Sequence, residues 1–167
     1  MVNQAIISMK KLLFLLGLTL ACNLLCAQEI KRVKIADIQR MIDTSTQPLI
    51  VNFWASWCTP CIHEIPWFEK NVAAFKDHNV KLLLVSLDLP GDYPGNLRKF
   101  INQHHYASQV VWLEDMKADE YCPKIDSTWH GTIPVSLFVN NQTHFRQFLN
   151  RQVTDPQVQL LLQQMTK

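Results

Sequence analysis

The chain contains little glycine, only 4 residues among 167, and it has 8 prolines. These low counts exclude a low-complexity or disordered chain, and the sequence shows no internal repeat of the kind that solenoids need. Charged residues make up 18% of the chain and apolar residues 48%. This length and composition predict one domain with a substantial hydrophobic core.

The uncharged, leucine-rich stretch near the N-terminus is too short to cross a bilayer comfortably. It runs from Leu12 to Leu25, whereas a spanning helix needs about twenty residues. Two lysines precede it and the small Ala27 follows it, which is the pattern of a secretory signal peptide. We therefore expect cleavage after Ala27 and export to the periplasm or cell envelope of a bacterium.

The same segment leaves three alternatives open. Translation that starts at Met9, next to Lys10, would shorten the signal peptide. An uncleaved segment would tether the protein to a membrane, and Cys22 lies in a sequence that loosely resembles a lipoprotein signal. The expected organisation is a signal peptide at 1–27 and one domain at 28–167.

Removal of the signal peptide leaves a domain without net charge. The whole chain has 16 Lys and Arg against 14 Asp and Glu. Lys10 and Lys11 leave with the signal peptide, so 14 residues of each sign remain. A neutral domain without a basic patch does not favour a nucleic-acid partner.

Apolar periodicity predicts alternating strands and helices after the signal peptide. Strands are expected at 33–35, 49–54, 81–87, 109–113, 135–139 and 143–148, and helices at 36–43, 58–75, 96–105, 119–129 and from 155 onward. This order implies parallel crossover units and then an antiparallel hairpin that turns at Asn140-Asn141. The expected class is α/β, a mixed central sheet with helices on both faces. Pro66 is expected to kink its helix and Asp155 to cap the last one.

Three cysteines remain in the domain, and two of them are three residues apart. Cys58 and Cys61 lie where a buried strand ends and a helix begins. The free N–H groups and the positive dipole end of a helix N-terminus favour a thiolate there. We therefore predict that Cys58 is the attacking thiol and that Cys61, one turn further on, resolves the mixed disulfide.

Two other interpretations of this pair stay open. The pair is also half of a zinc site, which Cys122 and scattered histidines would have to complete. Alternatively it forms an inert structural disulfide, although so short a loop contributes little closure entropy. An odd number of cysteines argues against a simple disulfide scaffold. Cys122 is expected to be a buried, idle thiol, the alternative being a third redox partner.

Two motifs together resemble the TlpA/ResA branch of the thioredoxin family. The first is the run from Val51 to Cys61, VNFWASWCTPC, followed by Glu64 and Pro66. The second, Gly131-Thr132-Ile133-Pro134, resembles the cis-proline loop of that family. The resemblance covers roughly residues 30–167 and implies a thioredoxin fold.

The resemblance also implies an activity and a setting. Members of this branch are exported, often membrane-tethered oxidoreductases that act on protein disulfides, and cytochrome c maturation is a recurrent setting for them. The expected partners are protein thiols or disulfides and an upstream electron donor such as a membrane thiol carrier. No cofactor and no metal are expected.

Matching positions suggest further site residues. A cis Pro134 would place the Ile133 backbone beside Cys58, where an extended substrate could pair with it; an ordinary trans proline is the alternative. In this family the carboxylate at Glu64 is close to the active site and could shuttle protons; the alternative is a solvated helix residue. Ordinary thioredoxins have a buried Asp where this chain has Asn52, which cannot titrate.

The surface around the pair is expected to bind substrate. Trp57, Thr59 and Pro60 belong to it together with Ile133 and Pro134, whereas Trp54 is expected in the core or a groove wall.

The sequence favours a reductase because Ile before the loop proline resembles reducing members. A thiol peroxidase is disfavoured, since peroxiredoxins lack a vicinal Cys-X-X-Cys. A non-enzymatic binding module or a copper chaperone remains the other alternative.

Overall fold

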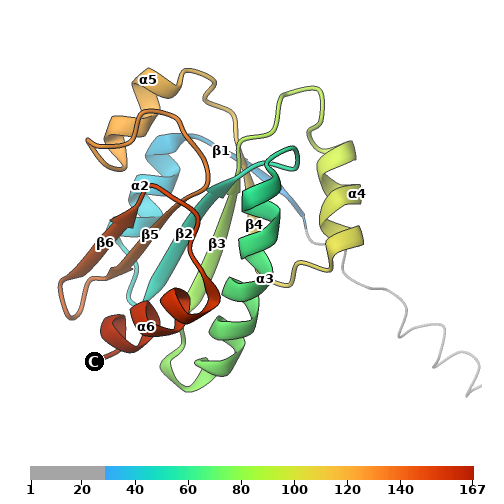
Figure 1. The fold of residues 1–167 in the computed structure, drawn as a ribbon. Coiled ribbons are helices and arrows are strands. Elements are labelled where there is room, and N and C mark those ends of the chain that lie inside the picture. The colour runs from blue at the N-terminus through green and yellow to red at the C-terminus, as the bar shows by residue number, and fades with distance from the viewer. Residues whose placement is uncertain (1–28) are drawn as a thin grey trace, which may run out of the picture.

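The computed structural model describes residues 29–167, so the expected signal peptide at 1–27 lies outside the described residues. Within them, six strands form one sheet in the order β1-β4-β3-β2-β5-β6 (Figure 1). The strands are β1 Lys31–Val33, β2 Leu49–Trp54, β3 Lys81–Ser86, β4 Gln109–Leu113, β5 Val135–Asn140 and β6 Phe145–Leu149. The helices are α2 Ile35–Asp43, α3 Thr59–Ala74, α4 Gly95–His104, α5 Ala118–Tyr121 and α6 Asp155–Met165, with 3₁₀ turns at η1 Lys76–His78 and η2 Cys122–Lys124.

The sheet is mixed, as expected. β1, β4, β3 and β2 run parallel, and β5 and β6 add an antiparallel hairpin next to β2. Side chains alternate between the two faces of each strand. In β2, Ile50 and Trp54 face one core cluster, and Val51 and Phe53 face the other. The expected fold class is confirmed.

Helices cover both faces of the sheet. We call one the α3 face, since buried side chains of α3, α4 and α6 pack there. The other is the α2 face, which α2 and the α5–η2 segment cover. Figure 1 shows α3 and α6 together on one side of the sheet. In the described part of the chain, no helix combines the length and apolar character that crossing a membrane requires.

Several predicted boundaries were wrong for reasons outside the local pattern. β1 ends at Val33 instead of running from 33 to 35, and Ile35 already opens α2. The Ile35 N–H donates to the Asp115 carboxylate at 2.6 Å, which supports this helix start from 80 residues away. The predicted helix at 119–129 ends early, as α5 and then η2.

The C-terminal part differs in two details. Thr154, not Asp155, occupies the cap position of α6, and its N–H donates to Gln157 Oε1 at 3.0 Å. Asp155 instead accepts hydrogen bonds from Lys70 and Asn71 of α3. The last hairpin turns later than predicted, because Asn140 still belongs to β5 and β6 begins only at residue 145.

Candidate active site

Cys58 and Cys61 form a disulfide at the start of α3, with their Cα atoms 5.3 Å apart. Cys58 is the cap residue of the helix and its carbonyl accepts the Ile62 N–H at 3.1 Å. It keeps 6% of its surface exposed, whereas Cys61 is fully buried. The structure therefore places Cys58 at the open end of the pair and Cys61 behind it. Thr59 and Pro60, between them, are exposed.

A buried carboxylate fixes the chain that leads into this turn. Asp88, two residues after β3, accepts the Ser56 N–H at 3.0 Å and the Ser56 hydroxyl. It also accepts the Ser86 hydroxyl at 2.7 Å, and its own carbonyl accepts the indole N–H of Trp112 at 2.8 Å. Sequence reasoning missed this anchor. The available clue was a Ser-x-Asp pair at the carboxyl end of a buried parallel strand, the same sheet edge as the cysteines.

Glu64 lies one helical turn beyond Cys61 and is fully buried. Its Oε1 accepts the Asn52 amide at 2.8 Å, and its Oε2 accepts the Val153 N–H at 2.7 Å. Burial raises the pKa of Glu64 to about 7, although these two hydrogen bonds favour the charged form. The solvated position that the sequence left open for Glu64 is therefore wrong.

Asn52 links this carboxylate to β5. Its amide nitrogen also donates to Ser136 Oγ at 2.9 Å, across the register pair that Asn52 and Ser136 form. Its carbonyl oxygen is buried without a hydrogen-bond partner among the described residues. An amide rotation would exchange the two ends, so Asn52 can serve a charged or a neutral Glu64.

The Ile133–Pro134 peptide is cis, in the predicted loop. The carbonyl of Thr132 accepts the Trp129 indole N–H at 2.8 Å, which ties the loop to the core. Gly131 has a φ of 92°, and an added Cβ there would lie 3.2 Å from Ala118 Cβ. Glycine is therefore required at this point of the loop.

The cis-proline loop and the cysteine turn meet in a small pocket. Its volume is about 150 Å³, and its lining includes Trp57 and Ile133 together with Leu113 and Met116. The Trp57 side chain is 61% exposed, whereas Trp54 is fully buried in the core. The structure thus brings two of the predicted substrate-binding residues, from distant parts of the chain, to one pocket.

Cys122 lies in the cluster on the α2 face, so the sheet separates it from the pair. It is a free, buried thiol, and burial raises its pKa to about 11. This placement agrees with the expected buried thiol. The described residues hold no group of three or more His, Cys, Asp and Glu arranged to bind a metal ion.

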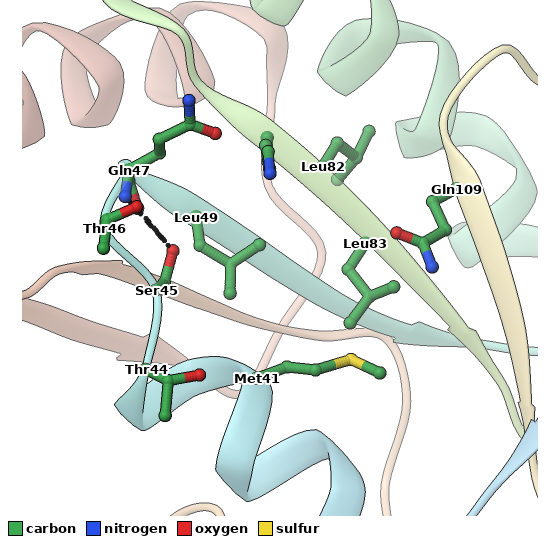
Figure 2. Close-up of a pocket in the computed structure, with 10 residues that line it drawn as sticks. Met41, Thr44, Ser45, Thr46, Gln47, Leu49, Leu82, Leu83 and Gln109 are labelled. Carbon is green, nitrogen blue, oxygen red and sulfur yellow. Dashed lines mark hydrogen bonds between the residues drawn. The ribbon is translucent and has the colours of Figure 1, made fainter.

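A second cavity, of about 270 Å³, lies at the opposite end of the sheet. Figure 2 shows Met41, the segment 44–47 and Leu49 around it, at the amino ends of β2 and β3. The Ser45 hydroxyl donates to the Gln47 carbonyl at 2.7 Å on its rim. The cysteine pair follows the carboxyl end of β2, so this cavity is separate from the disulfide.

A mixed sheet of this topology, with a cysteine pair opening α3 and a cis-proline loop beside it, defines a protein of the thioredoxin superfamily. Solved structures agree on the fold. A thiol:disulfide interchange protein from Chlorobium tepidum TLS superposes with a TM-score of 0.59 at 15% identity, covering 76% of this chain and 85% of the other. A thioredoxin-related protein from Neisseria meningitidis gives 0.58 at 22% identity, covering 73% and 84%.

The chain belongs to the AhpC/TSA family, whose model matches residues 19–147. It is 38% identical over 102 residues to sporulation thiol-disulfide oxidoreductase A of Bacillus subtilis, covering 60% of this chain and 58% of that protein. It is 37% identical over 49 residues to thiol-disulfide oxidoreductase ResA of Oceanobacillus iheyensis, covering 29% and 26%. The chain thus spans less than two thirds of the length of these relatives.

Proposed function

We propose that this protein is a thiol–disulfide oxidoreductase that reduces disulfides in other proteins through Cys58 and Cys61. The observation that carries the proposal is the disulfide at the first turn of α3, with the cis-proline loop sharing a pocket beside it. The names of the related proteins support the same chemistry.

The reaction starts from the reduced pair. The Cys58 thiolate attacks one sulfur of the substrate disulfide, which forms a mixed disulfide and releases the other substrate sulfur as a thiolate. The Cys61 thiolate then attacks Cys58 Sγ, forms the internal disulfide and releases the second substrate sulfur. The substrate gains two electrons and, on protonation, two protons, and the pair loses them. An external dithiol donor restores the reduced pair.

The two cysteines differ in position, and this difference supports different roles for them. Cys58 is at the cap of α3, where unpaired N–H groups and the helix dipole stabilise a thiolate. Cys61 is fully buried one turn inside the helix and can reach only a sulfur already bound to Cys58. Cys58 is therefore the nucleophile and Cys61 the resolving thiol.

Glu64 accepts the proton that Cys61 must lose. Because both side chains are buried one turn apart on α3, water has poor access to them. Burial places the pKa of Glu64 at about 7, so near neutral pH the carboxyl is found in both protonation states. A group with that pKa is suited to exchanging protons at neutral pH.

The substrate is an extended polypeptide segment around a disulfide. Trp57, Thr59 and Pro60 form the exposed surface on the cysteine side, and Ile133 and Pro134 form the loop on the other. The backbone at Ile133 offers hydrogen-bonding groups of the kind that β-strand addition uses. The pocket of about 150 Å³ that Trp57 and Ile133 both line fits one apolar side chain of the substrate.

The N-terminal pattern and the resemblance to the TlpA/ResA branch support a cellular location and an electron donor. A basic start, an apolar run and Ala27 support a signal peptide at 1–27 and export to the periplasm or cell envelope. A membrane thiol carrier is the proposed electron donor, and cytochrome c maturation the proposed setting. A membrane tether through the uncleaved segment or through Cys22 is the alternative to a free domain.

Trapping tests the proposal directly. In Cys61→Ala the resolving thiol is missing, so Cys58 should retain its substrates as mixed disulfides that mass spectrometry identifies. Cys58→Ala is the matched control. Capture no greater than in this control contradicts the exchange mechanism. Parallel assays with hydrogen peroxide and Cu(I) test the peroxidase and copper-carrier alternatives.

A further inference from the structure

A short segment between β6 and α6 contacts three separate parts of the proposed site. We call residues 150–153 the connecting strap; Figure 1 shows this connection leading into α6. Asn150 Oδ1 accepts the Thr132 hydroxyl at 2.7 Å, in the cis-proline loop. Gln152 Nε2 donates to the Pro60 carbonyl at 3.1 Å, in the first turn of α3. The Val153 N–H donates to buried Glu64 at 2.7 Å.

The two substrate-binding segments line one pocket but come from separate parts of the chain. The β2–β5 ladder ends at the pair of Phe53 and Val135. The cysteine turn at 57–60 and the loop at 131–134 both lie beyond that point. Among the described residues, no hydrogen bond joins one of these segments to the other. The strap is bonded to both.

The strap itself is anchored in the core. Val153 is fully buried in the cluster on the α3 face, and its N–H is held by the Glu64 carboxylate. Thr154, the next residue, caps α6. Gln152 is half-buried and Asn150 is exposed, so their side chains reach outward from a fixed backbone. Such an anchored segment can set the spacing of two surface segments that it contacts.

We propose that the connecting strap holds the cysteine turn and the cis-proline loop at the spacing that a substrate polypeptide requires. Asn150 and Gln152 are then positioning residues, because their hydrogen bonds go to Thr132 and Pro60 and not to the sulfurs. The inference rests on the disulfide exchange proposed above. A substrate that spans both segments binds well only when their relative placement is kept.

The test uses the full chain and separates substrate placement from sulfur reactivity. Gln152→Met keeps the side-chain length and removes the donor to Pro60; Thr132→Val keeps the shape and removes the donor to Asn150. Single-turnover reduction of a peptide closed by one disulfide gives a half-saturating concentration and a maximal rate. Alkylation of Cys58 by iodoacetamide, a reagent too small to span both segments, gives the sulfur reactivity.

We expect each variant to raise the half-saturating peptide concentration about fivefold, the factor that one net hydrogen bond represents. The maximal rate and the Cys58 alkylation rate should stay within about twofold of wild type. Thr132→Ser, which keeps the hydroxyl, should bind the peptide like wild type. Gln159→Met, the same substitution on an exposed position of α6, is the matched control. In the double variant the half-saturating peptide concentration should rise by less than the product of the two single increases, since both hydrogen bonds act through one strap.

If Gln152→Met and Thr132→Val both have the half-saturating peptide concentration of wild type, the positioning role is overturned and the exchange function is left intact. An equal loss of Cys58 alkylation also overturns it, because the residues would then act on the sulfur or on folding. A wild-type protein that fails to reduce the peptide overturns the proposed function and this inference with it. Thermal unfolding verifies that each variant is folded. If Gln152→Met is unfolded, Thr132→Val decides the question.

Discussion

The two faces of the central sheet are covered by similar helices, yet they are filled differently. On the α3 face the buried residues include Asn52, Glu64 and Ser136, connected by hydrogen bonds, beside the disulfide. The buried cluster on the α2 face consists of aliphatic and aromatic side chains and Cys122. A buried polar group is costly unless it is bonded. On the α3 face, hydrogen-bonded polar groups therefore take the place of apolar side chains beside the disulfide.

The thiols on the two faces repeat this contrast. Cys58 occupies a helix N-terminus and retains contact with solvent. Cys122 is enclosed among apolar neighbours, where burial raises its pKa to about 11 and disfavours the reactive thiolate. The same side chain is thus suited to attack in one place and to packing in the other.

The largest expected effect separates these thiols. Cys58→Ala should abolish reduction of a peptide disulfide, a loss of at least about 1,000-fold, because the nucleophile is gone. Cys122→Ala should keep the exchange rate within about twofold, since the sheet separates it from the reaction. Initial rates under single-turnover conditions measure both. An equally inactive Cys122→Ala would show that the α2 face takes part in the reaction and would contradict the contrast between the two thiols.

Packing on the α2 face should contribute strongly to the free energy of unfolding. Leu137 in β5 is fully buried in that cluster, so Leu137→Ala should lower the free energy of unfolding by about 2–5 kcal/mol. Urea titration of the oxidised protein measures this change. Leu160→Ala, at a side chain that is 52% exposed on α6, is the control and should cost far less. Equal losses in the two variants would contradict the assignment of Leu137 to the core.

Glu64 should make stability depend on pH in a characteristic direction. Its pKa rises from 4.5 to about 7 on folding, so between these values the folded protein holds a proton that the unfolded chain has lost. Stability therefore falls as pH rises from about 4.5 to 7, by up to about 3 kcal/mol in the wild type. Glu64→Gln should remove this slope, because Gln does not titrate and Asn52 can turn its carbonyl oxygen towards it.

Denaturant titrations at several pH values measure the slope, with Glu120→Gln on the surface as the control. The same variant tests the proton transfer. In wild type, resolution by Cys61 should speed up as pH rises through about 7, and Glu64→Gln should lose that step. If the rate of resolution in Glu64→Gln still rises with pH and the midpoint of that rise is unchanged, Glu64 is excluded as the proton acceptor.

Ser136→Ala should have the smallest effect. It removes one hydrogen bond from Asn52 and should cost about 1 kcal/mol of unfolding free energy. A less firmly held Asn52 donates less well to the charged carboxylate, so the pKa of Glu64 should rise slightly. The pH midpoint of stability reports that shift, with exposed Ser127→Ala as the control. A downward shift would show that Ser136 does not orient Asn52.

Local sequence patterns predicted the strands correctly where a continuous apolar run alone explains why the segment is buried in the sheet. The strands at 49–54 and 109–113 were predicted residue for residue, because continuous apolar stretches in buried parallel strands need no outside partner to be recognised. The cysteine pair and the cis-proline loop were found for a similar reason, since each motif is contiguous. The start of α2 and the cap residue of α6 were each wrong by one position, where a capping partner decided the boundary.

The fold class, the cysteine pair and the cis-proline loop could be predicted from the sequence, because each follows from residues that are close together in the chain. The contacts that hold the site together became visible only in the folded chain. Asp88 reaches Ser56 across 32 positions, and Gln152 reaches Pro60 across 92. Burial in the core raises the pKa of Glu64 against the opposing effect of the Val153 N–H, and no local spacing reveals either neighbour. Burial and hydrogen bonding between distant segments exist only once the chain has folded, so no local pattern could reveal them.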